Sequence, residues 1–101
     1  MSLKVVRSTR ARRDLSEHFL FIARDDLHAA HRLLDAYAKA ADRIAEYPDM
    51  GSYRRLYGPR LGYVRLWPIE GFEKYMLVYH VRPRSVLILR VLHAAQDYTR
   101  L

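Results

Sequence analysis

The hydrophobic pattern of the chain changes its period once, at the segment Tyr47-Pro48-Asp49-Met50-Gly51. Before this segment, apolar residues recur every three or four positions, which is the spacing of one face of an α-helix. After it, stretches rich in Val, Ile, Leu and Tyr follow a period of two, which is typical of strands. Proline cannot continue a helix and glycine permits a turn, so this segment ends the helical part. The order predicts an α+β protein.

Two helices are expected ahead of this boundary, preceded by a short strand over residues 3–7. Ser8 or Thr9 can cap the N-terminus of the first helix, because a hydroxyl accepts from the free N–H groups there. The pair Asp25-Asp26 interrupts the pattern and can cap the second helix in the same way. That helix has a continuous apolar face of roughly twenty residues, about 30 Å in length. The short link predicts that the two helices pack as an antiparallel hairpin.

Three strands are expected after the boundary, over residues 60–67, 75–82 and 85–93. Their links, residues 68–71 and the Pro83-Arg84 corner, are short, which favours an antiparallel meander. The third strand is apolar on both faces and is therefore expected to lie centrally in the sheet. The predicted fold is thus an N-terminal strand, an antiparallel helical hairpin and a three-stranded antiparallel meander, with a short C-terminal helix as an option. All 101 residues are expected to form one domain.

The composition argues against several kinds of site and location. There is no cysteine, which excludes disulfides, thiolate zinc sites and thiol nucleophiles. No apolar run approaches the roughly 18–20 residues that cross a bilayer, and the first residues lack the pattern of a secretory signal, so a soluble, cytoplasmic protein is expected. His28 and His31 share a helix face without a third strong ligand, and no glycine-rich phosphate loop is present. Neither a metal nor a cofactor is expected.

Positive charge is concentrated in the second half of the chain. The net charge is +7; residues 1–50 carry nine bases and eight acids, whereas residues 51–101 carry nine bases and three acids. Six of the eight tyrosines also lie in the second half. This combination indicates contact with a polyanion or with an acidic protein partner. The alternative is that the excess arginine only keeps a small domain in solution.

Three stretches, in this order along the chain, resemble the ParE/RelE superfamily of bacterial toxin–antitoxin toxins, on its ParE (plasmid-stabilisation) side. The first is Ala11-Arg12-Arg13-Asp14-Leu15 with Ile22-Ala23-Arg24-Asp25-Asp26, the second is Ile44 to Gly51, and the third is Tyr75 to Tyr79 with Leu89 to Asp97. Together they span almost the whole chain. The resemblance implies a small antiparallel sheet with a helical hairpin on one face. It also implies a hetero-oligomer with a small cognate antitoxin protein.

Two activities are known in that superfamily: ParE-like members poison DNA gyrase without an active site of their own, and RelE-like members cut mRNA on the ribosome. RNA cleavage needs a base, an acid and cations for the developing phosphorane charge. The only lysines are Lys4, Lys39 and Lys74, and none lies in the basic loop at residues 54–60. Gln96 stands where RelE-like chains often have an arginine. Gyrase poisoning by a protein that is not an enzyme is therefore favoured, and ribosome-dependent mRNA cleavage is the alternative.

Two sets of site residues follow. The expected partner-binding residues are Arg60, Arg65, Tyr79, Arg82, Arg90, His93 and Tyr98. If the protein were a nuclease, the catalytic set would be Arg54, Arg55, Arg65, Arg90 and His93.

Each of these roles has a structural alternative. Arg65 and Arg90 interrupt apolar strands, so each must reach solvent or a partner, or else form an internal ion pair with Glu73 or Asp97. His93 can instead hydrogen-bond the turn into Asp97-Tyr98.

The basic loop also allows two interpretations. Arg54, Arg55 and Arg60, with Tyr53 and Tyr57, suit phosphate binding and base stacking. A solvated loop whose tyrosines cover the edge of the core explains the same residues.

Overall fold

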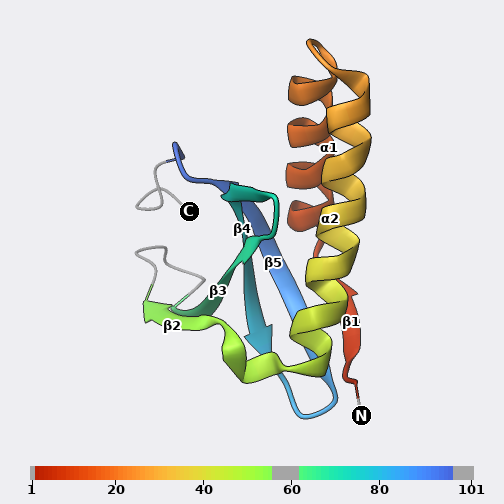
Figure 1. Ribbon diagram of the computed structural model, residues 1–101. Coiled ribbons are helices and arrows are strands. Elements are labelled where there is room, and N and C mark those ends of the chain that lie inside the picture. Colours follow the sequence, from red (N-terminus) through yellow and green to blue (C-terminus); the bar gives the residue numbers. More distant parts are fainter. Residues whose placement is uncertain (1, 56–61, 97–101) are drawn as a thin grey trace.

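A five-stranded sheet is covered on one face by two antiparallel helices (Figure 1). The computed structural model describes residues 2–55 and 62–96. The elements are β1 (Lys4–Arg7), α1 (Thr9–Ala23), α2 (Leu27–Glu46), a 3-10 turn η1 (Pro48–Met50), β2 (Ser52–Arg55), β3 (Tyr63–Ile69), β4 (Phe72–Val81) and β5 (Ser85–His93). The strand order is β1-β5-β4-β3-β2, with β1 parallel to β5 and every other pair antiparallel. This confirms the α+β class and the helical hairpin followed by a meander.

Both helices begin at the predicted caps. The Ser8 hydroxyl accepts from the Ala11 N–H at 3.0 Å, and an Asp26 carboxylate oxygen accepts from the Ala29 N–H at 3.0 Å. Each bond satisfies one of the N–H groups that a helix leaves free in its first turn. α2 ends at Glu46, where Pro48 prevents a further turn and opens η1 instead.

The structure contains one strand that the pattern does not predict, β2. It occupies the first part of the expected basic loop and pairs with β3, so that Tyr53 lies opposite Arg65. All four of its side chains are exposed, so it lacks the alternation by which a strand is predicted.

The β3–β4 link is also shorter than predicted. Pro68 does not end β3; it lies exposed at a shift in register next to Ile69, where a missing N–H is tolerated. The turn is reduced to Glu70-Gly71, and Gly71 has a φ of +85°, a conformation that favours glycine.

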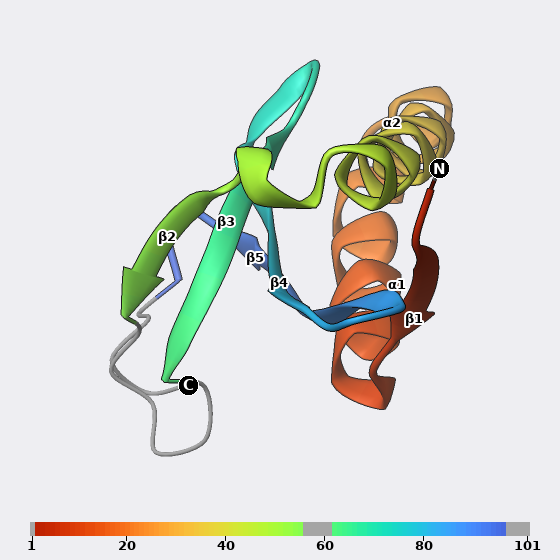
Figure 2. The ribbon, with the colours of Figure 1, turned by 90° about the horizontal axis from the view of Figure 1, so that it is seen from below.

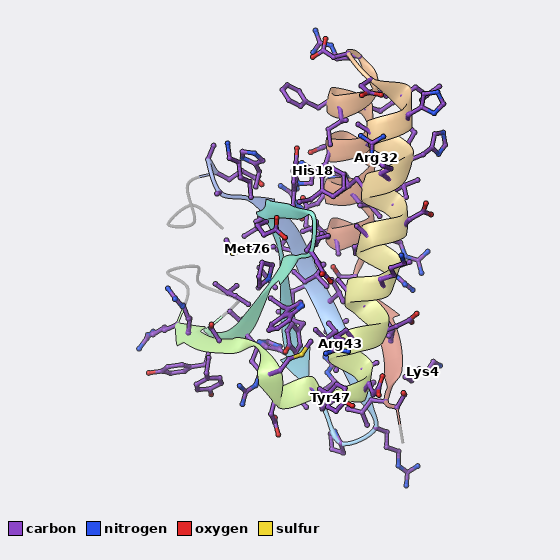
Figure 3. The ribbon with its side chains drawn as sticks, in the orientation of Figure 1. Lys4, His18, Arg32, Arg43, Tyr47 and Met76 are labelled. Atoms are coloured by element: carbon purple, nitrogen blue, oxygen red, sulfur yellow. The ribbon has the colours of Figure 1, made fainter. Side chains whose placement is uncertain are left out.

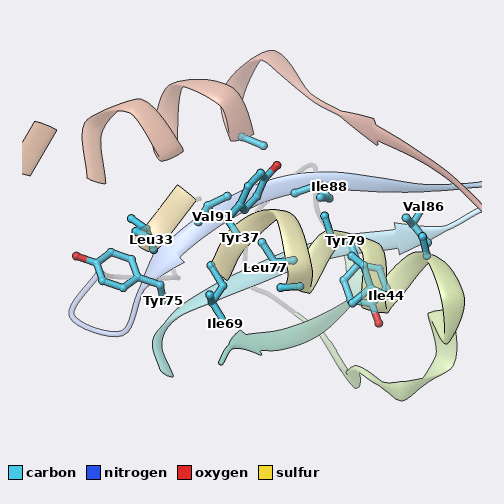
Figure 4. Packing of buried hydrophobic residues seen from close by; sticks show 14 residues of the cluster. Leu33, Tyr37, Ile44, Ile69, Tyr75, Leu77, Tyr79, Val86, Ile88 and Val91 are labelled. Atoms are coloured by element: carbon cyan, nitrogen blue, oxygen red, sulfur yellow. The ribbon is translucent and has the colours of Figure 1, made fainter. Parts of the chain in front are cut away.

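The core lies between the helical hairpin and the inner face of the sheet (Figure 4). α2 buries the small and large apolar residues of one stripe, among them Leu33, Tyr37 and Ile44, and β5 contributes Val86 and Ile88. β5 lies between β1 and β4, so it is an interior strand as expected, although β4 and not β5 is the middle strand of the five. A second, smaller apolar cluster lies on the sheet and contains Val64, Leu66, Val78 and Leu92.

β1 pairs with β5 only as far as Ile88, and beyond that residue the backbone at the edge of β5 is bound by side chains of α1 and of its N-cap residue Ser8. The Ser8 hydroxyl donates to the Leu89 carbonyl at 2.9 Å, and Asp14 accepts from the Val91 N–H at 3.0 Å. His18, which reaches from α1 towards the sheet (Figure 3), lies 2.7 Å from the Val91 carbonyl oxygen through Nε2. Polar side chains of one helix therefore satisfy backbone groups that a further strand would otherwise bind.

A buried ion pair reinforces this contact. Arg90 donates to Asp14 through Nε at 2.6 Å and through Nη2 at 3.1 Å. Asp14 is only 2% exposed and Arg90 only 7%. The expectation that Arg90 reaches solvent or a partner is therefore wrong, because its charge is neutralised inside the protein. The alternative of an internal ion pair is correct in kind, but its partner is Asp14 and not Glu73 or Asp97.

We expect the Asp14→Ala substitution to lower the free energy of unfolding by about 3–5 kcal/mol, because it leaves the Arg90 charge buried without a partner. Urea unfolding followed by Trp67 fluorescence measures the change. The control is Arg10→Ala, which removes a largely exposed guanidinium 3.8 Å from Asp14 and should cost less than about 1 kcal/mol. A loss for Asp14→Ala no larger than that of the control would contradict the prediction. A double variant, Asp14→Leu with Arg90→Leu, should recover much of the loss.

Candidate partner-binding surfaces

Tyr79, an expected partner-binding residue, is fully buried. Its hydroxyl donates to the Pro48 carbonyl at 2.8 Å and accepts from the Gly51 N–H at 3.1 Å, which ties η1 to the sheet. A Cβ at Gly51 would overlap the Tyr79 hydroxyl and lie 3.0 Å from the Leu66 carbonyl oxygen, so only glycine fits there. Tyr79 was expected to bind a partner, but its side chain is buried in this structure, where the phenol joins two parts of the chain.

Arg65 is half-buried and also holds η1 in place. It donates through Nη1 to the carbonyl oxygens of Gly51 at 2.9 Å and Asp49 at 3.2 Å. Its Nη2 lies 3.5 Å from the Asp49 carboxylate. Here too the internal ion pair exists, with Asp49 in place of Glu73 or Asp97. Arg65 is thus partly engaged by the chain itself.

His93 stabilises the turn that follows β5. Its backbone N–H donates to the Gln96 side chain at 2.6 Å, and its Nδ1 accepts from the Ala95 N–H at 3.0 Å. Its ring contacts the edge of Tyr75, with centroids 4.8 Å apart. The structural alternative for His93 is confirmed as far as Gln96, since the predicted contact with Asp97-Tyr98 lies outside the described residues.

The remaining expected partner-binding residues divide into two groups. Arg82 is exposed, directly after β4. Arg60 and Tyr98 lie outside the described residues, as does the optional C-terminal helix.

The expected nuclease set does not form one site. Arg54 and Arg55 lie on β2, while Arg90 is held in its buried pair. Arg65 of β3 pairs with Tyr79 of β4, and His93 of β5 pairs with Tyr75 of β4, four residues away along that strand. Four residues along a strand correspond to about 13 Å, and two strand spacings add about 10 Å across the sheet. Among the residues that the structure describes, Arg65 and His93 therefore cannot act on one phosphate.

A groove of about 940 Å³ separates α2 from the β3–β4 hairpin. Figure 2 shows the course of α2 and of the β3–β4 hairpin, the two elements whose residues line the groove. The α2 wall carries the exposed Arg32, Lys39 and Arg43, of which Arg32 and Arg43 are labelled in Figure 3. Acidic residues line the groove as well, Asp35 on α2 and Glu70 and Glu73 at the β3–β4 hairpin. Trp67 and Phe72 are the aromatic residues that line the groove. The residues of the groove were not predicted, because their proximity depends on how the hairpin bends relative to α2.

A second exposed feature consists of Tyr53, Arg55, Tyr63 and Arg65, called here the tyrosine–arginine cluster. The rings of Tyr53 and Tyr63 are stacked, with centroids 5.4 Å apart and planes 10° apart. The Arg65 guanidinium lies 5.1 Å from the centroid of Tyr53, and that of Arg55 lies 5.8 Å from the centroid of Tyr63. Tyr53 and Arg55 were expected to act together. The contribution of Tyr63 and Arg65 comes from the β2–β3 register, which the pattern did not predict.

Residues 2–55 and 62–96 contain neither a cluster of metal-ligating side chains nor a helix that could span a membrane. This part of the chain contains no group of three or more His, Cys, Asp or Glu side chains that could hold a metal ion. Instead, His31 packs edge-on against Phe19, with centroids 5.2 Å apart. Neither described helix is long and apolar enough to cross a membrane.

A family model described as the ParE toxin of the type II toxin–antitoxin system, parDE, matches residues 5–98. The chain belongs to the ParE toxin family. It is 36% identical over 99 residues to the protein named toxin Y4kP of Sinorhizobium fredii, covering 97% of this chain and 96% of that protein. It is 32% identical over 87 residues to toxin RelE3 of Caulobacter vibrioides, covering 86% and 89% of the two chains.

A solved structure shares the fold of this ParE family member. A chain from the chromosomal ParDE toxin–antitoxin system of P. aeruginosa superposes with a TM-score of 0.72 at 15% identity, covering 91% of this chain and 96% of that one. The resemblance to the ParE/RelE superfamily is therefore confirmed, and the protein is a toxin of a ParDE type II toxin–antitoxin system.

We expect this ParE toxin to lose stability in alkali. Burial raises the pKa of the Tyr37, Tyr75 and Tyr79 phenols above 10, since a phenolate is poorly solvated in the core. The unfolded chain then releases protons first, so the contribution of these phenols to stability is unchanged below about pH 10 and is lost as the pH rises from there through the higher folded pKa values. Absorbance titration at 295 nm should show phenols that ionise late and together with unfolding. Tyr79→Phe should reduce the alkaline loss, whereas Tyr47→Phe, which removes an exposed phenol, should not.

Proposed function

We propose that this toxin poisons DNA gyrase as a binding protein, in the cytoplasm, and that residues 1–101 act together as one toxin domain. The observation that carries the proposal is the position of the cationic and imidazole groups. Arg90 is bound to Asp14, Arg65 to Asp49, and His93 to the turn at Ala95. Groups that serve the fold in this way do not supply the acid, the base and the phosphate contacts that RNA cleavage needs at one point. Poisoning by binding requires no such convergence.

A second candidate function is ribosome-dependent cleavage of mRNA. It is favoured by the 32% identity to a protein named toxin RelE3. It is also favoured by the exposed Arg54 and Arg55 beside two stacked tyrosines, because such side chains suit contact with RNA.

Two assays on the purified toxin separate the candidates. We expect it to increase the linear, gyrase-cleaved form of a supercoiled plasmid only when gyrase is present, and to leave ribosome-bound mRNA intact. His93→Asn, which keeps a hydrogen-bonding group near the position of Nδ1, should poison gyrase to within about twofold of the wild type. For a nuclease that uses His93 as acid or base, the same variant would lose about 100-fold or more in rate. Ribosome-dependent RNA cleavage without any effect on gyrase would overturn the proposal.

The cognate antitoxin is the second partner, and we propose that an acidic amphipathic segment of it occupies the groove beside α2. The exposed Arg32, Lys39 and Arg43 on the α2 wall offer positive charge to such a segment, while Trp67 and Phe72 offer apolar surface. Asp35, Glu70 and Glu73 also line the groove, so the acidic side chains of the segment would have to face the three bases of α2. An anionic segment with apolar residues on one face complements this arrangement. The net charge of +7 favours the same class of partner at longer range.

Lys39→Glu should weaken antitoxin binding by about tenfold or more, because it places a like charge against the acidic segment. Isothermal titration calorimetry at two salt concentrations measures the effect, and binding by the wild type should weaken as salt rises. The matched control is Lys4→Glu, which makes the same charge change on β1, outside the groove. An equal loss for both variants, or binding that does not respond to salt, would show that the groove is not the contact.

A further inference from the structure

We propose that the tyrosine–arginine cluster (Tyr53, Arg55, Tyr63 and Arg65) binds single-stranded nucleic acid, with its bases stacked on the tyrosine rings. The site is separate from the groove beside α2, and the proposal does not depend on whether gyrase is the target.

The exposure of the two rings is the first reason. Tyr53 is 63% exposed and Tyr63 is 55% exposed, yet the rings are stacked on each other. One face of each ring lies against the other ring, and a guanidinium lies over each ring, Arg65 over Tyr53 and Arg55 over Tyr63. A base can extend this stack at an exposed ring or guanidinium plane, because every base has a matching π face. Aromatic rings and guanidinium planes are the groups on which proteins stack unpaired bases. Both kinds of group are present in the cluster.

The cluster is also held rigidly. Cross-strand pairing places Tyr53 opposite Arg65 and Arg55 opposite Tyr63, on one face of the β2–β3 ladder. Arg65 is anchored to the carbonyl oxygen of Gly51, which fixes the guanidinium beside Tyr53. A ligand that binds side chains already held in position loses less conformational entropy on binding.

The charge of the cluster suits a phosphate chain. Within the described residues, no carboxylate lies at ion-pair distance from Arg54 or Arg55. Asp49 is the acidic residue that borders the cluster, and its carboxylate already faces Arg65. Arginine binds phosphate through two parallel N–H groups, so Arg55, which shares the face of the rings, can hold the backbone while the rings hold the bases.

A shallow hollow beside the rings limits the size of the ligand. It has a volume of about 210 Å³ and is bordered by Tyr53, Tyr63 and Arg65. Sites that enclose a whole small molecule have volumes of roughly 300–1,000 Å³. The hollow is therefore too small to enclose such a ligand, and it suits one flat ring whose chain continues along the surface.

The structure supplies a matched control at the end of α2. Tyr47 is 51% exposed, and the Arg43 guanidinium lies 5.4 Å from its ring centroid. This is an exposed tyrosine with an arginine beside it, but without a second stacked ring among the described residues. Removing Tyr47 tests whether any exposed tyrosine–arginine pair on a basic protein gives the same result.

The experiment measures fluorescence anisotropy of labelled dT10 and U10 with the purified full-length chain in 100 mM salt. Tyr53→Ala and Tyr63→Ala should each weaken binding by about 5- to 150-fold, which corresponds to the loss of one stacked base. Tyr53→Phe, Tyr63→Phe and Tyr47→Ala should bind within about twofold of the wild type. Tyr53→Leu, which is apolar but not aromatic, should behave like Tyr53→Ala. Circular dichroism confirms that each variant is folded.

Two further outcomes test the class of ligand. Stacking does not depend on the 2′-hydroxyl, so dT10 and U10 should bind with similar affinity, and a preference above about tenfold would identify the natural strand as DNA or RNA. Competition by decaglutamate as effective as that by unlabelled dT10 would overturn the proposal, because it would indicate a site for any anion. Equal losses for Tyr53→Ala and Tyr47→Ala, or no loss for Tyr53→Ala, would also overturn it. Neither gyrase nor ribosomes are present, so failure here leaves the proposed function unaffected.

Discussion

The contact between Asp14 and Arg90 determines how the helices are placed on the sheet. The carboxylate accepts three hydrogen bonds from one short stretch of β5, two from Arg90 and one from the Val91 N–H. Because three donors at fixed positions bind this carboxylate, Asp14 can occupy only one position, and α1 therefore has only one register along β5. Ser8 and His18 bind the same strand on either side of it. Since α2 packs against α1, the position of the whole hairpin follows from this contact.

The segments that identify the family are largely parts of the scaffold. Asp14 and Arg90 come from the first and third of the resembling stretches, and they bind each other. Gly51 ends the second stretch and meets Tyr79, from the third, in a contact where no side chain fits. These residues are distinctive in the sequence because their partners constrain them closely. Partner recognition depends on exposed side chains, for which the fold allows more variation.

The predictions succeeded where the interactions are local. The caps at Ser8 and Asp26 act on N–H groups three residues away, so the sequence around them was sufficient. β2 was missed because its side chains are all exposed and its order depends on pairing with β3. The partner of Arg90 was missed because it lies 76 residues away, on an element whose position depends on the same contact. The candidate site followed this rule: Tyr53 and Arg55 were predicted, but the stack with Tyr63 was not.

The basic half of the chain presents less exposed charge than its composition indicates, but that charge is concentrated at one end of the sheet. Arg90 is engaged inside the protein, and the half-buried Arg65 is engaged by Asp49 at the surface. The exposed guanidiniums are at the end of β2 and in the β4–β5 turn, and the Arg84 carbonyl of that turn accepts from the N–H of Lys4. The β2–β3–β4 register brings the end of β2 towards the same end of the sheet. Clustered like charges raise the local potential and the rate of encounter with anions. That end of the toxin can therefore attract a nucleic acid strand to the tyrosine–arginine cluster, whereas the groove proposed for the antitoxin segment lies beside the β3–β4 turn, at the other end of these two strands.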